Sequence, residues 1–386
     1  MRSSRRIPDT VLSLLVNLHM RSRLHAASAL LLVSVSACAG EPSDTNGAGS
    51  SDRDVVSASA DEASGSASAD VDREPTVHTL ANLGDSISEG YDADDAEPIE
   101  IRKLIADRAS VFREQRELSW VQGTDPRVAS IARHYRALDP GLLIAPFSRA
   151  GSEIVGDDSA LPNFEEQARQ ITAANVKPDM VYVLLGGNDV CNRPRSLSAD
   201  ATATMYSVAR LREYAVRGLS ALVEALPAGA TVRVVSMPRV DRLYATIAMQ
   251  QIAVRYTTAS GPITSALTCK AFWTAVAAAD EDGVCKIVTT EPLPEKRAQI
   301  GARIDAYNDA LAEEVRRFAT DPALNPKGIV FRSDWQGRID KGGVKDASGG
   351  TFVYEAIHIS KRDCFHPSIE GQNALAKMVL ERASFR

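Results

Sequence analysis

The feature that most constrains the fold of this chain is a repeated alternation of short apolar runs and helix-like stretches from residue 76 onward. The runs are brief, several are rich in Val and Ile, and most lack polar alternation, as expected for parallel strands buried on both faces. They occupy residues 77–83, 142–147, 180–185, 231–236 and 329–332. Between them, apolar residues recur at spacings of three and four, which predicts amphipathic helices. These cover residues 164–174, 201–226, 304–318 and 369–382.

Strands that alternate with helices predict an α/β fold, because each crossover helix packs on a face of a parallel sheet. We expect a three-layer sandwich around a mostly parallel, doubly wound, flavodoxin-like sheet of five strands. The folded domain is expected over residues 76–386, with insertions near 92–140 and 238–300. Long insertions in compact domains are often functional, so these two either wall a ligand pocket or decorate the surface.

The first 37 residues have the pattern of an export signal rather than of a folded element. Basic residues precede an apolar run at 26–35, and small residues follow that run directly. The run is too short to span a bilayer as a helix. We therefore expect a signal peptide over residues 1–37, with Met20 as an alternative start.

The segment that ends this signal, Val35-Ser36-Ala37-Cys38, resembles the lipobox of bacterial lipoproteins. The resemblance implies cleavage before Cys38 and lipidation of its sulfur, which would anchor the protein to a membrane. The alternative is a plain secretory signal, which gives a secreted protein. Residues 39–75 contain few large apolar side chains, so we expect segment 38–75 to be a lipidated cysteine followed by a flexible tether. By analogy with known lipoproteins, Ala39 favours the outer membrane or cell surface.

Net charge and motif content argue against several functional classes. The net charge is −6 and the pI is about 5.7, so no basic excess points to nucleic-acid binding. No CxxC pair and no HExxH motif occurs, so the sequence predicts no metal site and no cofactor. The oligomeric state is left open.

The cysteines are expected to form disulfides. There are five, and lipidation of Cys38 leaves an even set of four for an oxidising compartment. Three pairings are possible. Cys269 and Cys285 flank one short stretch of the second insertion, which favours a local bridge and leaves Cys191 to pair with Cys364.

Three polar segments lie where a catalytic site is expected in such a sheet, at or beyond the carboxyl ends of strands. Gly84-Asp85-Ser86 follows the first apolar run, and Gly186-Gly187-Asn188-Asp189 follows the third. Asp363 precedes His366 by three residues, which lets its carboxylate reach the imidazole Nδ1 and orient the ring. Each segment alone is equally typical of a turn, a helix cap or a surface ion pair.

Together, and in this order, the three segments resemble the blocks of the SGNH, or GDSL-like, hydrolase superfamily over most of residues 77–384. The resemblance implies Ser86 as nucleophile, His366 as general base and Asp363 as its orienting acid. It also implies an oxyanion hole formed by the Ser86 N–H and the Asn188 amide. The sequence around Asn188 and His366 is similar to the phospholipase B-like and acyloxyacyl hydrolase-like branches.

One block departs from the family pattern. The family's second block has Asn followed by a Gly whose N–H completes the oxyanion hole. This chain reads Phe147-Ser148-Arg149-Ala150-Gly151, so Ser148 takes the place of the asparagine and Gly151 is the candidate donor. If Asn188 and His366 share a cleft, Cys191 and Cys364 lie within a few residues of it, which also favours their pairing.

The resemblance implies an exported serine esterase or lipase that hydrolyses a small-molecule or lipid ester through an acyl-enzyme and needs no metal or cofactor. One alternative is a polysaccharide O-deacetylase on the same scaffold. A second is a non-catalytic, lipid-anchored binding protein. The nucleophile and base are both present, which argues against the last reading.

Overall fold

The computed structural model describes residues 76–100, 112–258, 261–279, 283–333, 344–345, 351–352 and 355–383. The expected signal peptide, Cys38 and the tether lie outside these residues. The strands are β1 Thr79–Gly84, β2 Ile99–Glu100, β3 Leu143–Pro146, β4 Met180–Leu184, β5 Thr231–Val235, β6 Gln251–Thr258, β7 Gly261–Thr268, β8 Val330–Arg332, β9 Val344–Lys345 and β10 Thr351–Phe352. The α-helices are α3 Ile131–Leu138, α4 Phe164–Ala173, α5 Gly187–Cys191, α6 Val208–Ala225, α7 Leu243–Ile247, α8 Cys269–Ala279, α9 Lys286–Thr289, α10 Pro294–Thr320 and α11 Ile369–Ala383.

Five parallel strands form the main sheet in the order β3-β1-β4-β5-β8, which confirms the expected doubly wound α/β fold. All five predicted strands are present. β1 is an interior strand: Ala81 aligns with Ala145 of β3 on one side and with Val181 of β4 on the other. Since all the strands are parallel, the loops after β1, β3 and β4 leave the sheet at the same edge, where ligands bind in such folds.

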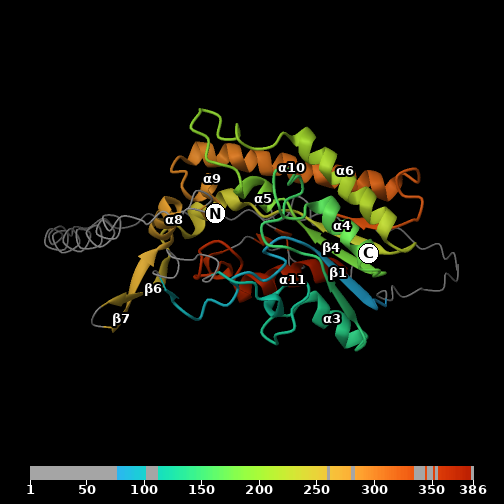
Figure 1. Cartoon of the computed structure of the whole chain (residues 1–386), viewed down its shortest axis with the longest axis horizontal. Coiled ribbons are helices and arrows are strands. Elements are labelled where there is room, and N and C mark those ends of the chain that lie inside the picture. The colour runs from blue at the N-terminus through green and yellow to red at the C-terminus, as the bar shows by residue number, and fades with distance from the viewer. Residues whose placement is uncertain are drawn as a thin grey trace, which may run out of the picture. The chain divides into compact units, whose positions relative to one another are not determined.

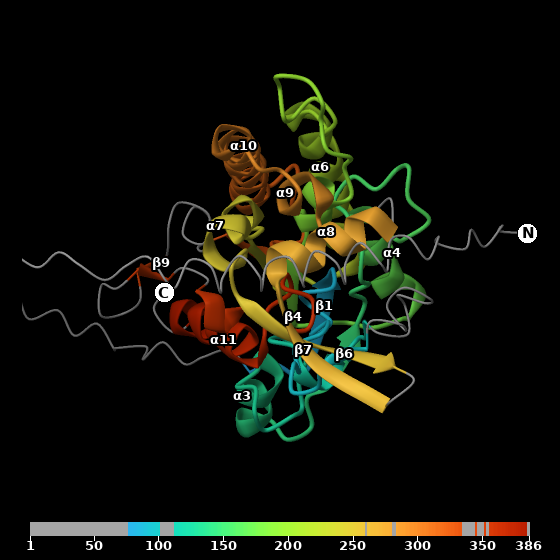
Figure 2. The same cartoon turned by 90° about the vertical axis from the view of Figure 1, so that its left-hand side faces the viewer.

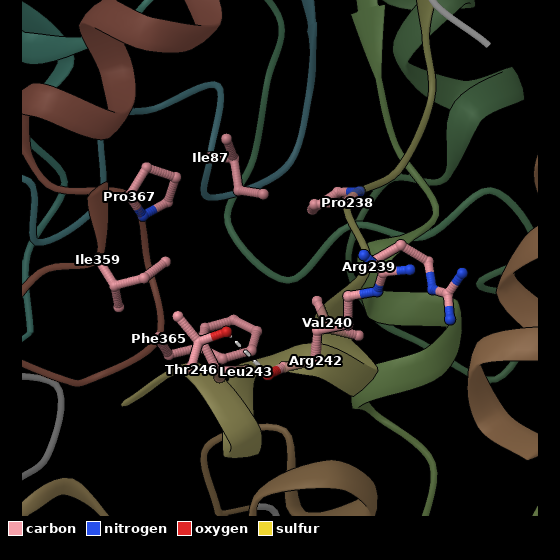
Figure 3. A pocket seen from close by; sticks show the side chains of 10 residues that line it. All are labelled: Ile87, Pro238, Arg239, Val240, Arg242, Leu243, Thr246, Ile359, Phe365 and Pro367. Carbon is pink, nitrogen blue, oxygen red and sulfur yellow. Dashed lines mark hydrogen bonds between the residues drawn. The ribbon is translucent and has the colours of Figure 1, made fainter. Parts of the chain in front are cut away.

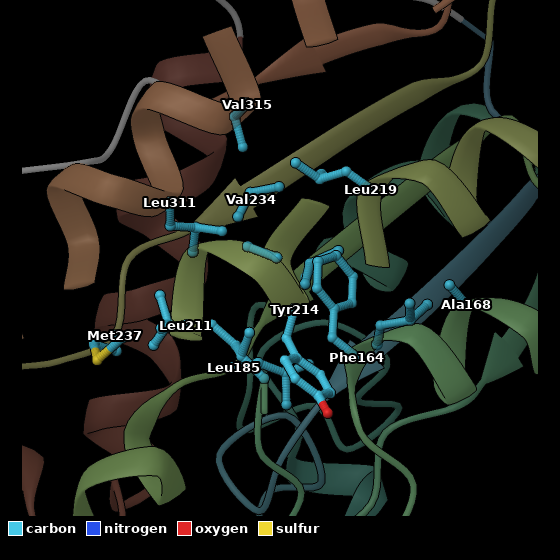
Figure 4. Close-up of a cluster of buried hydrophobic side chains, with 14 of the residues drawn as sticks. Phe164, Ala168, Leu185, Leu211, Tyr214, Leu219, Val234, Met237, Leu311 and Val315 are labelled. Carbon is cyan, nitrogen blue, oxygen red and sulfur yellow. The ribbon is translucent and has the colours of Figure 1, made fainter. Parts of the chain in front are cut away.

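The sheet is covered on both faces, as its apolar strands predict. Alternate strand residues point to opposite sides, so Val181 and Val183 join one buried cluster while Met180 and Tyr182 join another. Helices α4, α6 and α10 cover the first face and α3 and α11 the second (Figure 1). Figure 4 shows the first cluster, in which Phe164 lies between the sheet and α6.

Local capping explains where several helices begin. The Asn163 side chain accepts the Glu166 N–H and the Glu166 carboxylate accepts the Asn163 N–H, a capping box that starts α4. The Ser207 side chain caps α6, so this helix begins at Val208 and not near residue 201 as predicted. Helix α10 begins at Pro294, about ten residues before the predicted start, because proline suits the first helical turn.

The sequence between β5 and α10 adds elements that hydrophobic periodicity did not reveal. β6 and β7 form an antiparallel hairpin that pairs with β2 and extends away from the main sheet (Figure 2). Residues of α7, α8 and this hairpin share a third buried cluster that includes Phe272, Trp273 and Cys364. Within the described part of the chain, no helix combines the length and apolar character needed to cross a bilayer.

The four cysteines expected to be oxidised are all in disulfides, but the expected pairing is wrong. Cys191 is joined to Cys285, and Cys269 is joined to Cys364. The local bridge fails because α8 starts at Cys269 and carries the chain away for eleven residues, about 16 Å, before Cys285 is reached. The two disulfides place the protein in an oxidising compartment, outside the cytosol.

A glycine in α6, Gly218, lets that helix pack closely on α4. A Cβ at Gly218 would lie 2.2 Å from a carbon of the buried Phe164 ring. Alanine would gain about 1 kcal/mol in helix propensity, but overpacking against a fixed ring costs about 1–3 kcal/mol. We expect Gly218→Ala to lower the free energy of unfolding by roughly 1 kcal/mol in urea titrations. Ser220→Ala, on the same helix and partly exposed, is the control and should be neutral or slightly stabilising. A stabilised Gly218→Ala protein would contradict this packing.

Candidate active site

The turn after β1 holds Ser86 at the edge of the sheet. A Cβ at Gly84 would lie 2.2 Å from the Ser88 Oγ and 3.0 Å from the Leu184 carbonyl oxygen, so only glycine fits this close approach. The buried Gln167 of α4 accepts the Gly84 N–H at 2.8 Å and donates to the Gly84 carbonyl at 2.9 Å. Ser86 is consequently presented on a rigid turn, with 7% of its surface exposed.

The C-terminal loop before α11 brings the predicted histidine to this serine. His366 Nε2 lies 2.8 Å from Ser86 Oγ, across 280 residues of sequence. On the other side of the ring, Nδ1 is hydrogen bonded to Asp363 Oδ2. Asp363 Oδ1 accepts the backbone N–H groups of Phe365 and His366 at 2.9 and 3.0 Å, so this carboxylate is fixed by its own loop. The three side chains form a continuous hydroxyl–imidazole–carboxylate chain.

The charges around His366 suit the role of a general base. Burial by itself lowers the pKa of His366, but the neighbouring carboxylates of Asp363, Asp92 and Asp85 together outweigh it, Asp363 contributing most, so the net pKa is raised from 6.5. Asp363 is 1% exposed and the imidazole 12%. A basic imidazole that is hydrogen bonded to a hydroxyl can accept its proton.

The three expected oxyanion donors each keep an N–H without a partner among the described residues. Ser86 and Gly151 have no acceptor for their backbone N–H groups, and Asn188 uses one amide hydrogen on the Ser152 carbonyl at 3.0 Å. Gly151 has a φ of +84°, a conformation that glycine adopts without strain. Ser148, which stands where the family has asparagine, is held to Asn82 through its backbone N–H and its hydroxyl.

Buried acids hold the loop that carries Gly151. Glu89 accepts the Ala150 N–H at 2.7 Å, and Asp189 accepts the Ile154 and Val155 N–H groups at 2.7 and 2.9 Å. Burial raises the pKa of Asp189 to about 8, with Glu153 adding to the shift. The loop is therefore fixed from both ends by polar groups of the two neighbouring loops.

One residue that the sequence analysis did not identify, Asp92, lies beside Asp363 and His366. Asp92 is fully buried, and it pairs with Arg362 at 3.0 Å while its second carboxyl oxygen has no hydrogen-bond partner within the described structure. Burial raises the pKa of Asp92 to about 7, and the Asp363 carboxylate adds to the rise. No motif marks Asp92, because it approaches Asp363 only through the tertiary fold.

The same acids could in principle offer ligands to a metal ion. One ligand atom each from Asp92, Asp363 and His366 lie within 4.8 Å of one another. Both ring nitrogens of His366 already have partners, Asp363 and Ser86. The arrangement therefore fits a positioned imidazole better than a metal ligand.

The disulfides attach the segment between β5 and α10 to the loop that carries His366 and to the loop that carries Asn188. Cys364 lies between Asp363 and His366 and is bonded to Cys269 at the start of α8. Cys191 ends the short helix that carries Asn188 and is bonded to Cys285. The bridges thus connect each loop to the added segment and not to each other.

A pocket of about 620 Å³, its open mouth included, is lined by residues next to Ser86 and His366 in the sequence. Ile87, Phe365 and Pro367, the immediate neighbours of those two residues, form part of its wall (Figure 3). The facing wall comes from the segment after β5.

Comparison with known proteins gives one family. A model of the GDSL-like Lipase/Acylhydrolase family matches residues 80–379. No curated protein sequence matches the chain significantly. One similar solved structure is an active site mutant of a family two carbohydrate esterase from Clostridium thermocellum, with 12% identity and a TM-score of 0.38. That match covers 80% of this chain and 63% of the esterase, less than two thirds of its length. A second solved structure has 15% identity and a TM-score of 0.35, covering 80% of this chain and 96% of that one.

The raised pKa of His366 can be measured directly. Because Asp363 is the largest of the contributions that oppose the effect of burial, Asp363→Asn should move the imidazole titration midpoint to lower pH. NMR of the ring resonances should give a midpoint above 6.5 in the unmodified protein and a clearly lower one in the variant. Glu370→Gln, an exposed carboxylate nearby, is the control and should leave the midpoint nearly unchanged. Equal midpoints in the two Asp363 forms would contradict the assignment.

Proposed function

Because the chain belongs to the GDSL-like lipase/acylhydrolase family and is therefore an ester hydrolase in the general sense, we propose that it is a serine esterase that cleaves carboxylic esters through an acyl-enzyme on Ser86. The observation that carries the proposal is the 2.8 Å contact between Ser86 Oγ and His366 Nε2, with Asp363 on the opposite ring nitrogen. A hydroxyl at neutral pH needs such an adjacent base to become nucleophilic.

In the first step, His366 takes the Ser86 proton while Oγ attacks the ester carbonyl carbon. The carbonyl oxygen becomes an oxyanion, which the free N–H groups of Ser86, Gly151 and Asn188 are suited to bind. Loss of one such donor typically costs about 10²–10³ in rate. As the tetrahedral intermediate collapses, the bond to the alcohol oxygen breaks, and His366 donates its proton to the leaving alcohol.

In the second step, water enters and His366 removes a proton from it. The hydroxide attacks the acyl carbonyl, and the bond to Ser86 Oγ breaks. The acid product leaves, and Ser86 regains the proton from His366. Asp363 stays ionised and stabilises the imidazolium in both steps.

The pocket beside Ser86 favours a lipid or other apolar ester as substrate. Seven of its ten lining residues are apolar, which suits a hydrocarbon substituent better than an acetyl group on a hydrophilic sugar. A polysaccharide O-deacetylase on this scaffold is the less favoured alternative. Hydrolysis rates across a series of acyl lengths, compared with those on acetylated xylan, distinguish the two.

We further propose export and anchoring through Cys38. The two disulfides support export, since such bonds persist in oxidising compartments. The small residues before Cys38 support lipidation at that position.

Ser86→Ala tests the mechanism. The variant lacks the nucleophile, so kcat for a p-nitrophenyl ester should fall by about 10⁴-fold or more. The matched control is Ser88→Ala, two residues along the same turn, which removes a buried hydroxyl that has no hydrogen-bond partner among the residues the structure describes. A fluorophosphonate should label the unmodified protein and Ser88→Ala, but not Ser86→Ala. Full activity in Ser86→Ala would rule out the acyl-enzyme, and a folded protein that neither labels nor hydrolyses esters would point to a binding protein.

Cys38→Ser tests the anchor. The variant should lose palmitate incorporation and appear in the soluble fraction, because the thioether to the lipid cannot form. Esterase activity should be kept, since the substitution changes none of the residues proposed for catalysis. Unchanged membrane association of the variant would refute lipidation at this cysteine.

A further inference from the structure

The two walls of the pocket differ in chemistry. The wall formed by Ile87, Phe365 and Pro367 is apolar and adjoins the reacting groups, whereas the facing wall contains Arg239 and Arg242. Figure 3 shows these arginines on the segment that follows β5, across the pocket from Ile87 and Pro367. The pocket therefore places apolar groups on the wall next to the reacting residues and guanidinium groups on the opposite wall.

The two arginines are not equivalent. Arg239 Nε and Nη2 lie 2.6 and 2.8 Å from the Asp241 carboxylate, and Nη1 lies 3.0 Å from Asp305. Its donors are thus occupied by two acids. The half-buried Arg242 has no side-chain hydrogen bond or ion pair with any described residue.

An unpaired cation in this position is costly unless a ligand supplies the counter-charge. Removing a guanidinium from water beside Leu243 and Val240 carries a desolvation penalty. Arg239 with its two acids has a net negative charge, so it cannot attract an anion. The donors open to an anionic group in this wall are therefore those of Arg242.

We propose that Arg242 binds one anionic group, a carboxylate or a phosphate, on the apolar substituent of an ester held at Ser86. The preferred substrate is then an anionic amphiphile and not a neutral ester. This inference rests on the proposed esterase function and adds the charge of the substrate to it. Guanidinium donors in a fork geometry match both carboxylate and phosphate oxygens.

The test compares matched ester pairs that differ only in a terminal charge. One pair is a p-nitrophenyl ester of a monocarboxylic acid and the p-nitrophenyl monoester of the dicarboxylic acid of equal chain length. A second pair places a carboxylate or a phosphate on the alcohol of an acetyl ester. The measured quantity is the ratio of kcat/KM for the charged ester to that for its neutral partner. We expect Arg242→Gln to lower this ratio about tenfold for at least one pair, and Arg242→Lys to restore part of it.

Lys361→Gln is the matched control. Lys361 is an exposed cation near His366 that does not line the pocket, so its removal should leave the ratio unchanged. A ratio that is the same in the unmodified protein and in Arg242→Gln, for acyl-side and alcohol-side charges alike, would overturn the proposal. An equal fall of this ratio in Lys361→Gln would also overturn it, because the effect would then come from the overall charge of the protein and not from a contact with Arg242.

A binding measurement separates this inference from the proposed function. Calorimetry on the Ser86→Ala protein compares the methyl monoester of a dicarboxylic acid with the methyl ester of the matching monocarboxylic acid. Tighter binding of the charged ester that is lost on adding Arg242→Gln supports the anion site without any turnover. If the unmodified protein did not react with a fluorophosphonate, the esterase mechanism would be wrong, whereas the binding result for Arg242 would still hold.

Discussion

The site depends on the interior position of β1, between β3 and β4 of a parallel sheet. Its pairing with β3 and β4 brings three loop regions to one edge, where Ser86, Gly151 and Asn188 begin their turns. Parallel strands need crossovers through helices, so these loops are distant in sequence and close in space. A shift of register in β1 would move its apolar side chains to the wrong face and misplace all three donors.

Buried acids are the second constraint. Three of them accept backbone N–H groups of the loops that form the site: Glu89, Asp189 and Asp363. Burial raises the pKa of Asp189. Burying a carboxyl group is unfavourable, and these hydrogen bonds offset part of that cost. The gain is rigidity at the loops, which a preorganised oxyanion hole requires.

The segment between β5 and α10 is attached to the site by both disulfides and also lines the pocket. Its cysteines bridge to the loops of Asn188 and His366, and its residues form the wall of the pocket that faces them. Any group that enters this pocket would therefore contact the same segment that the disulfides attach to the loops of Asn188 and His366.

The sequence by itself determined the α/β fold, the five strands and the expectation that Ser86, Asp363 and His366 act together, because apolar periodicity and short motifs are local properties. It did not determine the start of α10, the β6–β7 hairpin, the disulfide partners, the place of Asp92 beside Asp363 or the place of Arg242 in the pocket wall. The bonded cysteines are separated by 94 and 95 residues, and Asp92 is 271 positions before Asp363 (363 − 92). Such contacts follow from how helices and loops pack on the sheet, so only the tertiary structure decides them.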